Sequence, residues 1–125
     1  MVRLTTSCAR TDGKNMKKKL RIGWFSFSCS EDSTIIFTEL LNNHYQDWFD
    51  KIEFCSATIL KKKNEIKNLD VSFVEGAITS QKQAEKLLEI RKESKKLVAI
   101  GACACVGMPS SQRNLFDEKT NEEIK

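Results

Sequence analysis

The stretch KKLVAIGACACVGMPSSQRN, residues 95–114, decides the fold class of this chain. Four consecutive apolar residues lead into Gly101, and only small residues flank Cys103 and Cys105. An apolar run that ends at a glycine is typical of a buried strand in a parallel sheet. Two sulfur ligands after such a strand indicate a site beyond its carboxyl end, because ligands of parallel sheets bind there.

A strand–helix alternation extends from this stretch toward the amino terminus. The segments typical of strands are residues 20–28, 51–58, 70–77 and 97–102. Two further segments, 33–49 and 79–96, carry apolar residues at helical spacing. This order predicts an α/β fold, in which helices cover a parallel sheet that is buried on both faces.

The helical segments also predict which side chains pack on the sheet. The first helix places five large side chains near one face: Ile35, Ile36, Leu40, Leu41 and Tyr45. The second helix places four on one side: Ala84, Leu87, Leu88 and Arg91. Ser33 or Thr34 is expected to cap the first helix, and Ser80 the second.

Length and charge restrict the function classes. The chain has 125 residues, 21 of them basic and 17 acidic, with a net charge of +4. This length suits one domain with its own core. The basic residues form short runs without interleaved aromatics, which indicates a solvated surface rather than nucleic-acid binding. The sequence contains no run of 18 apolar residues that would span a membrane.

The amino terminus and the cysteines bear on organisation and compartment. Residues 1–16 are polar and poorly patterned, so we expect a flexible extension followed by a domain over residues 17–125. They also lack the apolar centre of a signal peptide. Five cysteines, an odd number, favour a reducing, cytoplasmic compartment over a disulfide framework.

Three expected loops at one edge of the sheet carry side chains suited to metal or proton chemistry. Cys29 and Asp32 follow the first strand, and Glu75 with Gly76 ends the third. Gly101, Cys103 and Cys105 belong to the fourth strand and the loop after it. The carboxyl ends of parallel strands meet at one edge, so these loops are expected to converge there.

Zinc and nucleotide cofactors fit these loops poorly. Zinc normally takes four ligands in paired short spacings, whereas this chain offers one C-x-C and one C-x-x-D, and its only histidine, His44, lies mid-helix. A phosphate cradle after the first strand would meet the two carboxylates of SCSEDST. An iron–sulfur cluster fits better, because it takes thiolates from separate loops and small residues let backbone amides approach.

The segments IGWFSFSCSEDSTIIFTELLN, DVSFVEGAI and KLVAIGACACVGMPSSQRN resemble the small subunit of nickel–iron hydrogenases and the 20 kDa subunit of the NADH:ubiquinone oxidoreductase family. Within it, the sulfhydrogenase or non-F420-reducing type is the most similar. The resemblance implies a flavodoxin-like domain that holds a proximal 4Fe-4S cluster beside a large catalytic subunit. It also implies further electron-transfer subunits as partners and no catalysis by this chain alone.

The family pattern carries over to some residues and departs at others. Cys29 matches the first cysteine of a C-x-x-C, and Asp32 stands where the second is expected. Glu75 with Gly76 matches a Glu-Gly, and Cys103 matches a G-x-C that begins at Gly101. The family's fourth cysteine has no counterpart before Lys125, so the chain is expected to be part of a longer subunit or a shortened homologue.

Several interpretations stay open at this point. Asp32 is either an iron ligand or a cap of the first helix, and Cys105 is either a substitute ligand or a packing residue. Glu75 is expected to support the site rather than to bind metal, and Cys55 to fill the core. The alternative function is a flavodoxin-like interaction or assembly module that has lost its cluster, or a complex I-like electron-transfer subunit.

Overall fold

The computed structural model describes residues 18–57 and 65–123. The expectations about the extension over residues 1–16 fall outside this range. The described residues form the elements β1 (Leu20–Ser26), α1 (Asp32–Phe49), β2 (Ile52–Ala57), β3 (Leu69–Glu75), α2 (Gln81–Glu93), β4 (Ser94–Ile100), α3 (Gly101–Val106), the 3-10 helix η1 (Ser110–Leu115) and α4 (Glu118–Glu123).

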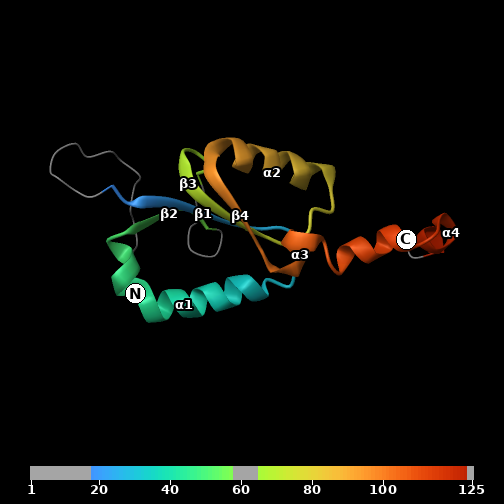
Figure 1. The fold of residues 1–125 in the computed structure, drawn as a ribbon, viewed down its shortest axis with the longest axis horizontal. Helices are drawn as coiled ribbons and strands as arrows, with labels where there is room; N and C mark the ends of the chain where they lie inside the picture. Colours follow the sequence, from blue (N-terminus) through green and yellow to red (C-terminus); the bar gives the residue numbers. More distant parts are fainter. Residues whose placement is uncertain (1–17, 58–64, 124–125) are drawn as a thin grey trace.

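The four strands form one parallel sheet in the order β2-β1-β3-β4. Figure 1 shows α1 and α2 on opposite faces of this sheet, which makes three layers. The predicted α/β fold with a parallel sheet is therefore confirmed, and its strand order is consistent with a flavodoxin-like fold. No helix in the described part of the chain is long and apolar enough to cross a membrane.

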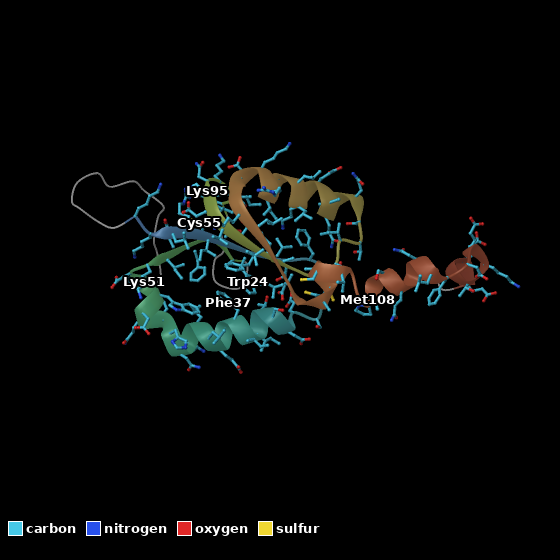
Figure 2. The ribbon with its side chains drawn as sticks, in the orientation of Figure 1. Trp24, Phe37, Lys51, Cys55, Lys95 and Met108 are labelled. Carbon is cyan, nitrogen blue, oxygen red and sulfur yellow. The ribbon has the colours of Figure 1, made fainter. Side chains whose placement is uncertain are left out.

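The core lies around the two inner strands. One apolar cluster joins five buried residues from four elements: Phe25, Cys55, Leu69, Val74 and Ile90. Burying each large apolar side chain contributes about 1.5–3 kcal/mol. On the opposite face, the ring of Trp24 stacks on Phe37 of α1, with 4.3 Å between their centroids (Figure 2). The expectation that Cys55 fills the core is confirmed.

The predicted inner face of α1 is wrong. Ile35, Ile36, Leu40 and Tyr45 are between 44% and 58% exposed, and only Leu41 of the expected set is half-buried. The helix instead turns Thr34 and Phe37 toward the sheet. Thr34 is buried because its hydroxyl has hydrogen-bond partners, which hydrophobic periodicity does not detect.

The helix starts are partly as predicted. α1 begins at Asp32, and the residue before it, Glu31, has a left-handed backbone and no side-chain cap bond. Neither Ser33 nor Thr34 therefore caps α1, and Asp32 lies inside the first turn. The prediction for α2 is confirmed, because the Ser80 side chain accepts a hydrogen bond from the backbone N–H of Gln83.

The second helix and the last strand also differ in detail. Ile90 is the buried residue of α2, whereas Leu88, expected to face the sheet, is 62% exposed. β4 begins three residues earlier than predicted, at Ser94, and ends at Ile100. The expected loop after it is a short helix, α3, which starts at Gly101.

Candidate cofactor site at the carboxyl ends of the strands

The three predicted loops do leave the sheet at the same edge. β1, β3 and β4 are parallel, and they end at Ser26, Glu75 and Ile100, which are in register across the sheet. Beyond β1 and β3 the chain makes one antiparallel bridge between Ser28 and Ala77. Backbone hydrogen bonds therefore join the segment that carries Cys29 to the segment that follows Glu75.

Glu75 is the buried centre of this edge. It is 3% exposed, and its Oε1 accepts hydrogen bonds from the hydroxyls of Ser26, at 2.6 Å, and Thr34. The indole N–H of Trp24 donates to the Thr34 hydroxyl at 2.9 Å. One carboxylate thus joins β3, β1 and the first turn of α1, and it fixes the start of α1 relative to the sheet.

Gly76 is required directly after this carboxylate. Its φ is +89°, a backbone conformation that side chains disfavour. A Cβ at this position would lie 2.9 Å from backbone atoms of Phe27 and Ser28, which do not give way easily. Gly76 therefore lets the segment before Cys29 approach the end of β3.

Gly101 has a similar conformation but more space. Its φ is +78°, and a Cβ would meet only the Ser33 hydroxyl, at 3.4 Å. Gly101 thus lies against the first turn of α1 and starts α3, the helix that carries Cys103 and Cys105. Gly101 therefore places the start of α3 beside the first turn of α1, which follows the Cys29 loop.

The surroundings of the Cys29 thiol disfavour its ionised form. Burial raises the pKa of the Cys29 thiol above its ordinary value, and a hydrogen bond with the Glu31 backbone opposes the rise. The negative charges of Glu75, Glu31 and an ionised Cys103 raise it further. A raised pKa means that a metal must compete with a proton for the Cys29 sulfur.

The other two predicted ligands, Asp32 and Cys105, have hydrogen-bond partners of their own. The Asp32 carboxylate accepts a hydrogen bond of 2.7 Å from the Ser30 hydroxyl, in an exposed position. The Cys105 thiol points back along the chain, with its sulfur 3.6 Å from the carbonyl oxygen of Ala99. In the part of the chain that the structure describes, no three His, Cys, Asp or Glu side chains converge closely enough to hold a metal ion.

An iron–sulfur cluster fits this edge only in part. Cys29 and Cys103 are two half-buried thiols on separate segments that follow the carboxyl edge of the sheet, and a cluster takes its thiolates from such separate segments. A cubane cluster takes four such ligands, and the described residues do not present a third and a fourth in this arrangement. The described residues thus present two thiols here, against the four ligands that a cubane cluster takes.

Sequence reasoning missed the polar residues that hold the loops. Besides Ser26 and Thr34, the Ser28 hydroxyl lies 2.8 Å from the Thr79 hydroxyl and accepts from the Gln83 amide at 3.0 Å. These contacts tie the Cys29 loop to the start of α2. The density of hydroxyls in SFSCSEDST was the available signal, since hydroxyls that become buried or half-buried need hydrogen-bond partners.

Exposed apolar side chains occur on the segments that follow the cysteines in sequence. Ile35 and Ile36, in the first turn of α1, are 56% and 58% exposed. Val106 and Met108, after Cys105, are 66% and 40% exposed. Exposed large apolar side chains mark a contact with another protein where they form one patch.

Residues 29–125 match the protein family described as NADH ubiquinone oxidoreductase, 20 kDa subunit. Among characterised proteins, a stretch of 66 residues is 35% identical to one of the subunits of the F420-non-reducing hydrogenase, both in Methanothermobacter thermautotrophicus and in Methanothermobacter marburgensis. This stretch covers 53% of the chain and 21% of either relative.

A longer but weaker similarity runs to the delta subunit of the NAD-reducing hydrogenase HoxS of Cupriavidus necator. It is 23% identical over 105 residues, which are 84% of the chain and 50% of that subunit. A solved structure of an NAD+-reducing [NiFe]-hydrogenase in the H2-reduced state superposes with a TM-score of 0.73 at 23% identity, and the match covers 83% of this chain and 57% of that one. The chain thus spans about half or less of the length of these proteins, and the structural match supports the fold.

Proposed function

This chain belongs to the NADH ubiquinone oxidoreductase 20 kDa subunit family, and we propose that it is an electron-transfer subunit of a hydrogenase-like oxidoreductase. In this proposal it holds a 4Fe-4S cluster at the carboxyl edge of the sheet, beside a nickel–iron large subunit, in the cytoplasm. The observation that carries it is that the Cys29 loop and α3, which carries Cys103, both follow the carboxyl edge of the sheet, where Glu75, Gly76 and Gly101 hold the chain.

Each residue has a separate task in this proposal. Cys29 and Cys103 are thiolate ligands, and Asp32 and Cys105 are the candidates within this chain for the remaining positions. Glu75, whose Oε1 is already bound by two hydroxyls, positions α1 and the Cys29 loop rather than binding iron. The cluster supplies one-electron transfer when bound; this chain supplies ligands, shielding and orientation.

In this proposal the large subunit binds the exposed apolar side chains next to the cysteines. The apolar side chains of Ile35, Ile36, Val106 and Met108 lie on the segments that adjoin the cysteines. A large subunit that covers them would also shield a cluster from water. The relatives reported above are subunits of hydrogenases, which supports a hydrogenase large subunit as the partner.

Anaerobic reconstitution with iron and sulfide tests the cluster. We expect Cys29→Ser and Cys103→Ser to lose nearly all bound iron, and Asp32→Cys to retain more than the wild type, because a thiolate suits iron better than a carboxylate. The matched control is Cys55→Ala, which removes a buried core thiol outside this edge. Iron and acid-labile sulfide per chain, with the visible absorption spectrum, are the readouts.

A second function has one observation in its favour. The absence of a three-residue metal group in the described residues fits an interaction or assembly module without a cluster. If neither the wild type nor Asp32→Cys retains iron while the chain still binds a hydrogenase large subunit, this second function replaces the first.

A further inference from the structure

Ser28, the residue before Cys29, is held by both its backbone and its side chain. Its N–H donates to the Ala77 carbonyl at 3.2 Å, and its carbonyl accepts from the Ala77 N–H at 2.9 Å. Its hydroxyl lies 2.8 Å from the Thr79 hydroxyl and accepts from the side-chain amide of Gln83 at 3.0 Å. All three partners belong to the segment that runs from the end of β3 into α2. Ser28 therefore joins the Cys29 loop to that segment.

Gln83 completes a closed ring of side-chain hydrogen bonds. Its Oε1 accepts from the Thr79 backbone N–H at 2.8 Å and from the Thr79 hydroxyl at 3.1 Å. Because the Thr79 hydroxyl donates to Gln83, the Ser28 hydroxyl is the donor between the two hydroxyls. The Gln83 Nε2 then donates to Ser28 and closes the ring. Each side chain both donates and accepts, so the bonds strengthen one another.

Capping of α2 does not account for the contact with Ser28. The Ser80 side chain caps the helix by accepting from the Gln83 backbone N–H. The Gln83 Oε1 satisfies one more backbone N–H before the helix, that of Thr79, and a glutamate oxygen would serve that purpose equally well. The amide nitrogen adds what a carboxylate lacks, which is a donor for Ser28, 55 positions away in the sequence.

A neutral side chain also suits the charge around Cys29. The negative charges of Glu75 and Glu31 already raise the pKa of this thiol, together with burial. A glutamate in place of Gln83 would put a further carboxylate against Ser28, whereas the amide adds no charge. The amide thus fastens the loop without further disfavouring the thiolate that a metal requires.

We propose that Gln83 is a positioning residue for Cys29 and acts through Ser28. The inference rests on the proposed function, in which the Cys29 sulfur is an iron ligand. The bonds to Ala77 hold the backbone of Ser28, and the amide of Gln83 holds its side chain, so the residue before the ligand is fixed at two points. Because Gln83 belongs to a helix of 13 residues, the loop takes its place from a regular element. The ligand is therefore ordered before a metal binds, which lowers the cost of binding.

Alkylation of the reduced, metal-free 125-residue chain with iodoacetamide tests the positioning without a cluster. Peptide mass spectrometry gives the rate at Cys29 and, as an internal reference, the rate at Cys103 in the same sample. We expect Gln83→Met and Ser28→Ala each to raise the ratio of the Cys29 rate to the Cys103 rate about three- to tenfold, because the loss of a hydrogen bond shifts local opening by such a factor. Ser28→Thr, which keeps a hydroxyl, should keep the wild-type ratio.

Ser80→Ala is the matched control, because it removes the cap of α2 and leaves the bond between Gln83 and Ser28 in place. It should not change the ratio. The double variant Ser28→Ala/Gln83→Met should equal the larger single effect, since both changes remove the same link. A ratio that Gln83→Met leaves unchanged, or that Ser80→Ala raises equally, overturns the proposal. If Gln83→Met unfolds the chain and exposes both cysteines alike, Ser28→Ala decides, and an unchanged ratio there overturns it.

Anaerobic reconstitution of the same variants with iron and sulfide then tests the role toward a metal. We expect Gln83→Met and Ser28→Ala to retain less iron per chain than the wild type, and Ser80→Ala and Ser28→Thr to retain as much. Equal iron in all variants of a chain that binds a cluster overturns the inference. A wild type that retains no iron overturns the proposed cluster instead, and the alkylation ratio still decides whether Gln83 positions Cys29.

Discussion

β3 and β4 are neighbouring parallel strands of seven residues each, yet only β3 is buried. In β3, Leu69, Ser72, Val74 and Glu75 are buried, whereas in β4 only Ser94 is. The apolar run Leu97–Ile100 looked at least as suited to a core as the sequence of β3. Burial of a strand therefore depends on having a strand on each side and a helix on each face, and β4 has a described neighbour on one side only.

A pair of leucine truncations is the strongest test of this comparison. Leu69 is fully buried in β3, and Leu97 is 37% exposed in β4. We expect Leu69→Ala to lower the free energy of unfolding by about 2–5 kcal/mol, because it leaves a cavity, and Leu97→Ala by less than about 1 kcal/mol. Urea unfolding followed by circular dichroism measures both at a concentration where the chain is monomeric. Equal effects would mean that β4 is covered in solution.

The glycines that follow the two strands differ in the space around them. Gly76 follows β3 and Gly101 follows β4, and both have positive φ. We expect each change to alanine to cost about 1–2 kcal/mol of backbone strain. Gly76→Ala should cost at least about 1 kcal/mol more, since its Cβ would lie 2.9 Å from the backbone of Phe27 and Ser28. Unfolding midpoints of the two variants give the difference, and the opposite order would contradict the close approach of the Cys29 loop.

The buried carboxylate at the end of β3 should have a smaller effect. Glu75→Gln keeps the size of the side chain but replaces the charged acceptor of the Ser26 and Thr34 hydroxyls. We expect a loss of about 1–3 kcal/mol. The matched control is Glu39→Gln on the exposed side of α1, for which we expect less than about 0.5 kcal/mol. Tryptophan fluorescence adds a local readout, because Trp24 donates to Thr34; a spectrum unchanged in Glu75→Gln would argue against the chain of hydrogen bonds.

Sequence alone predicted the parallel α/β fold, the order of elements from β1 to β4 and the edge at which the three loops leave the sheet. The period of the apolar residues and the rule for carboxyl ends suffice for these, since both are local or topological. It failed on the inner face of α1, where buried Thr34 serves Glu75 and exposed Ile35 and Ile36 do not pack. It also failed on β4, because the exposure of Leu97 depends on which strand lies beyond it, and no feature of the strand itself records that.

For the candidate site, the residue types were predictable and the directions of the side chains were not. The spacing of Cys103 and Cys105 says nothing about the Cys105 thiol pointing back to the Ala99 carbonyl. Likewise, the hydrogen bond from Ser30 to Asp32 depends on the left-handed backbone at Glu31, which a non-glycine residue rarely adopts. The roles of Cys29, Asp32, Cys103 and Cys105 as ligands stay predictions.

An exposed ion pair joins β4 to β3. Asp70 of β3 binds the ammonium of Lys95 on β4 at 2.7 Å and accepts from the backbone N–H of Arg21 on β1 at 2.9 Å. The hydrogen bond from Lys95 lowers the pKa of the Asp70 carboxyl below its ordinary value of 3.8, and the Arg21 N–H lowers it further. Because the folded pKa is below the unfolded one, the ionised carboxylate stabilises the fold above the ordinary pKa. This contribution disappears as the pH falls through the folded pKa.

We therefore expect Asp70→Asn to lower the free energy of unfolding by about 0.5–1 kcal/mol at pH 7, since the Lys95 side chain is 71% exposed and the pair is screened by water. The difference between variant and wild type should shrink below pH 3, where the wild-type carboxylate is also protonated, and in high salt at pH 7. Urea unfolding across this pH range measures it, with Asp47→Asn on α1 as the control for a carboxylate that is 75% exposed. A difference that persisted unchanged at low pH would show that the amide disturbs packing between β3 and β4 rather than removing a charge. In that case the edge strand would depend on shape at this position and not on its ion pair.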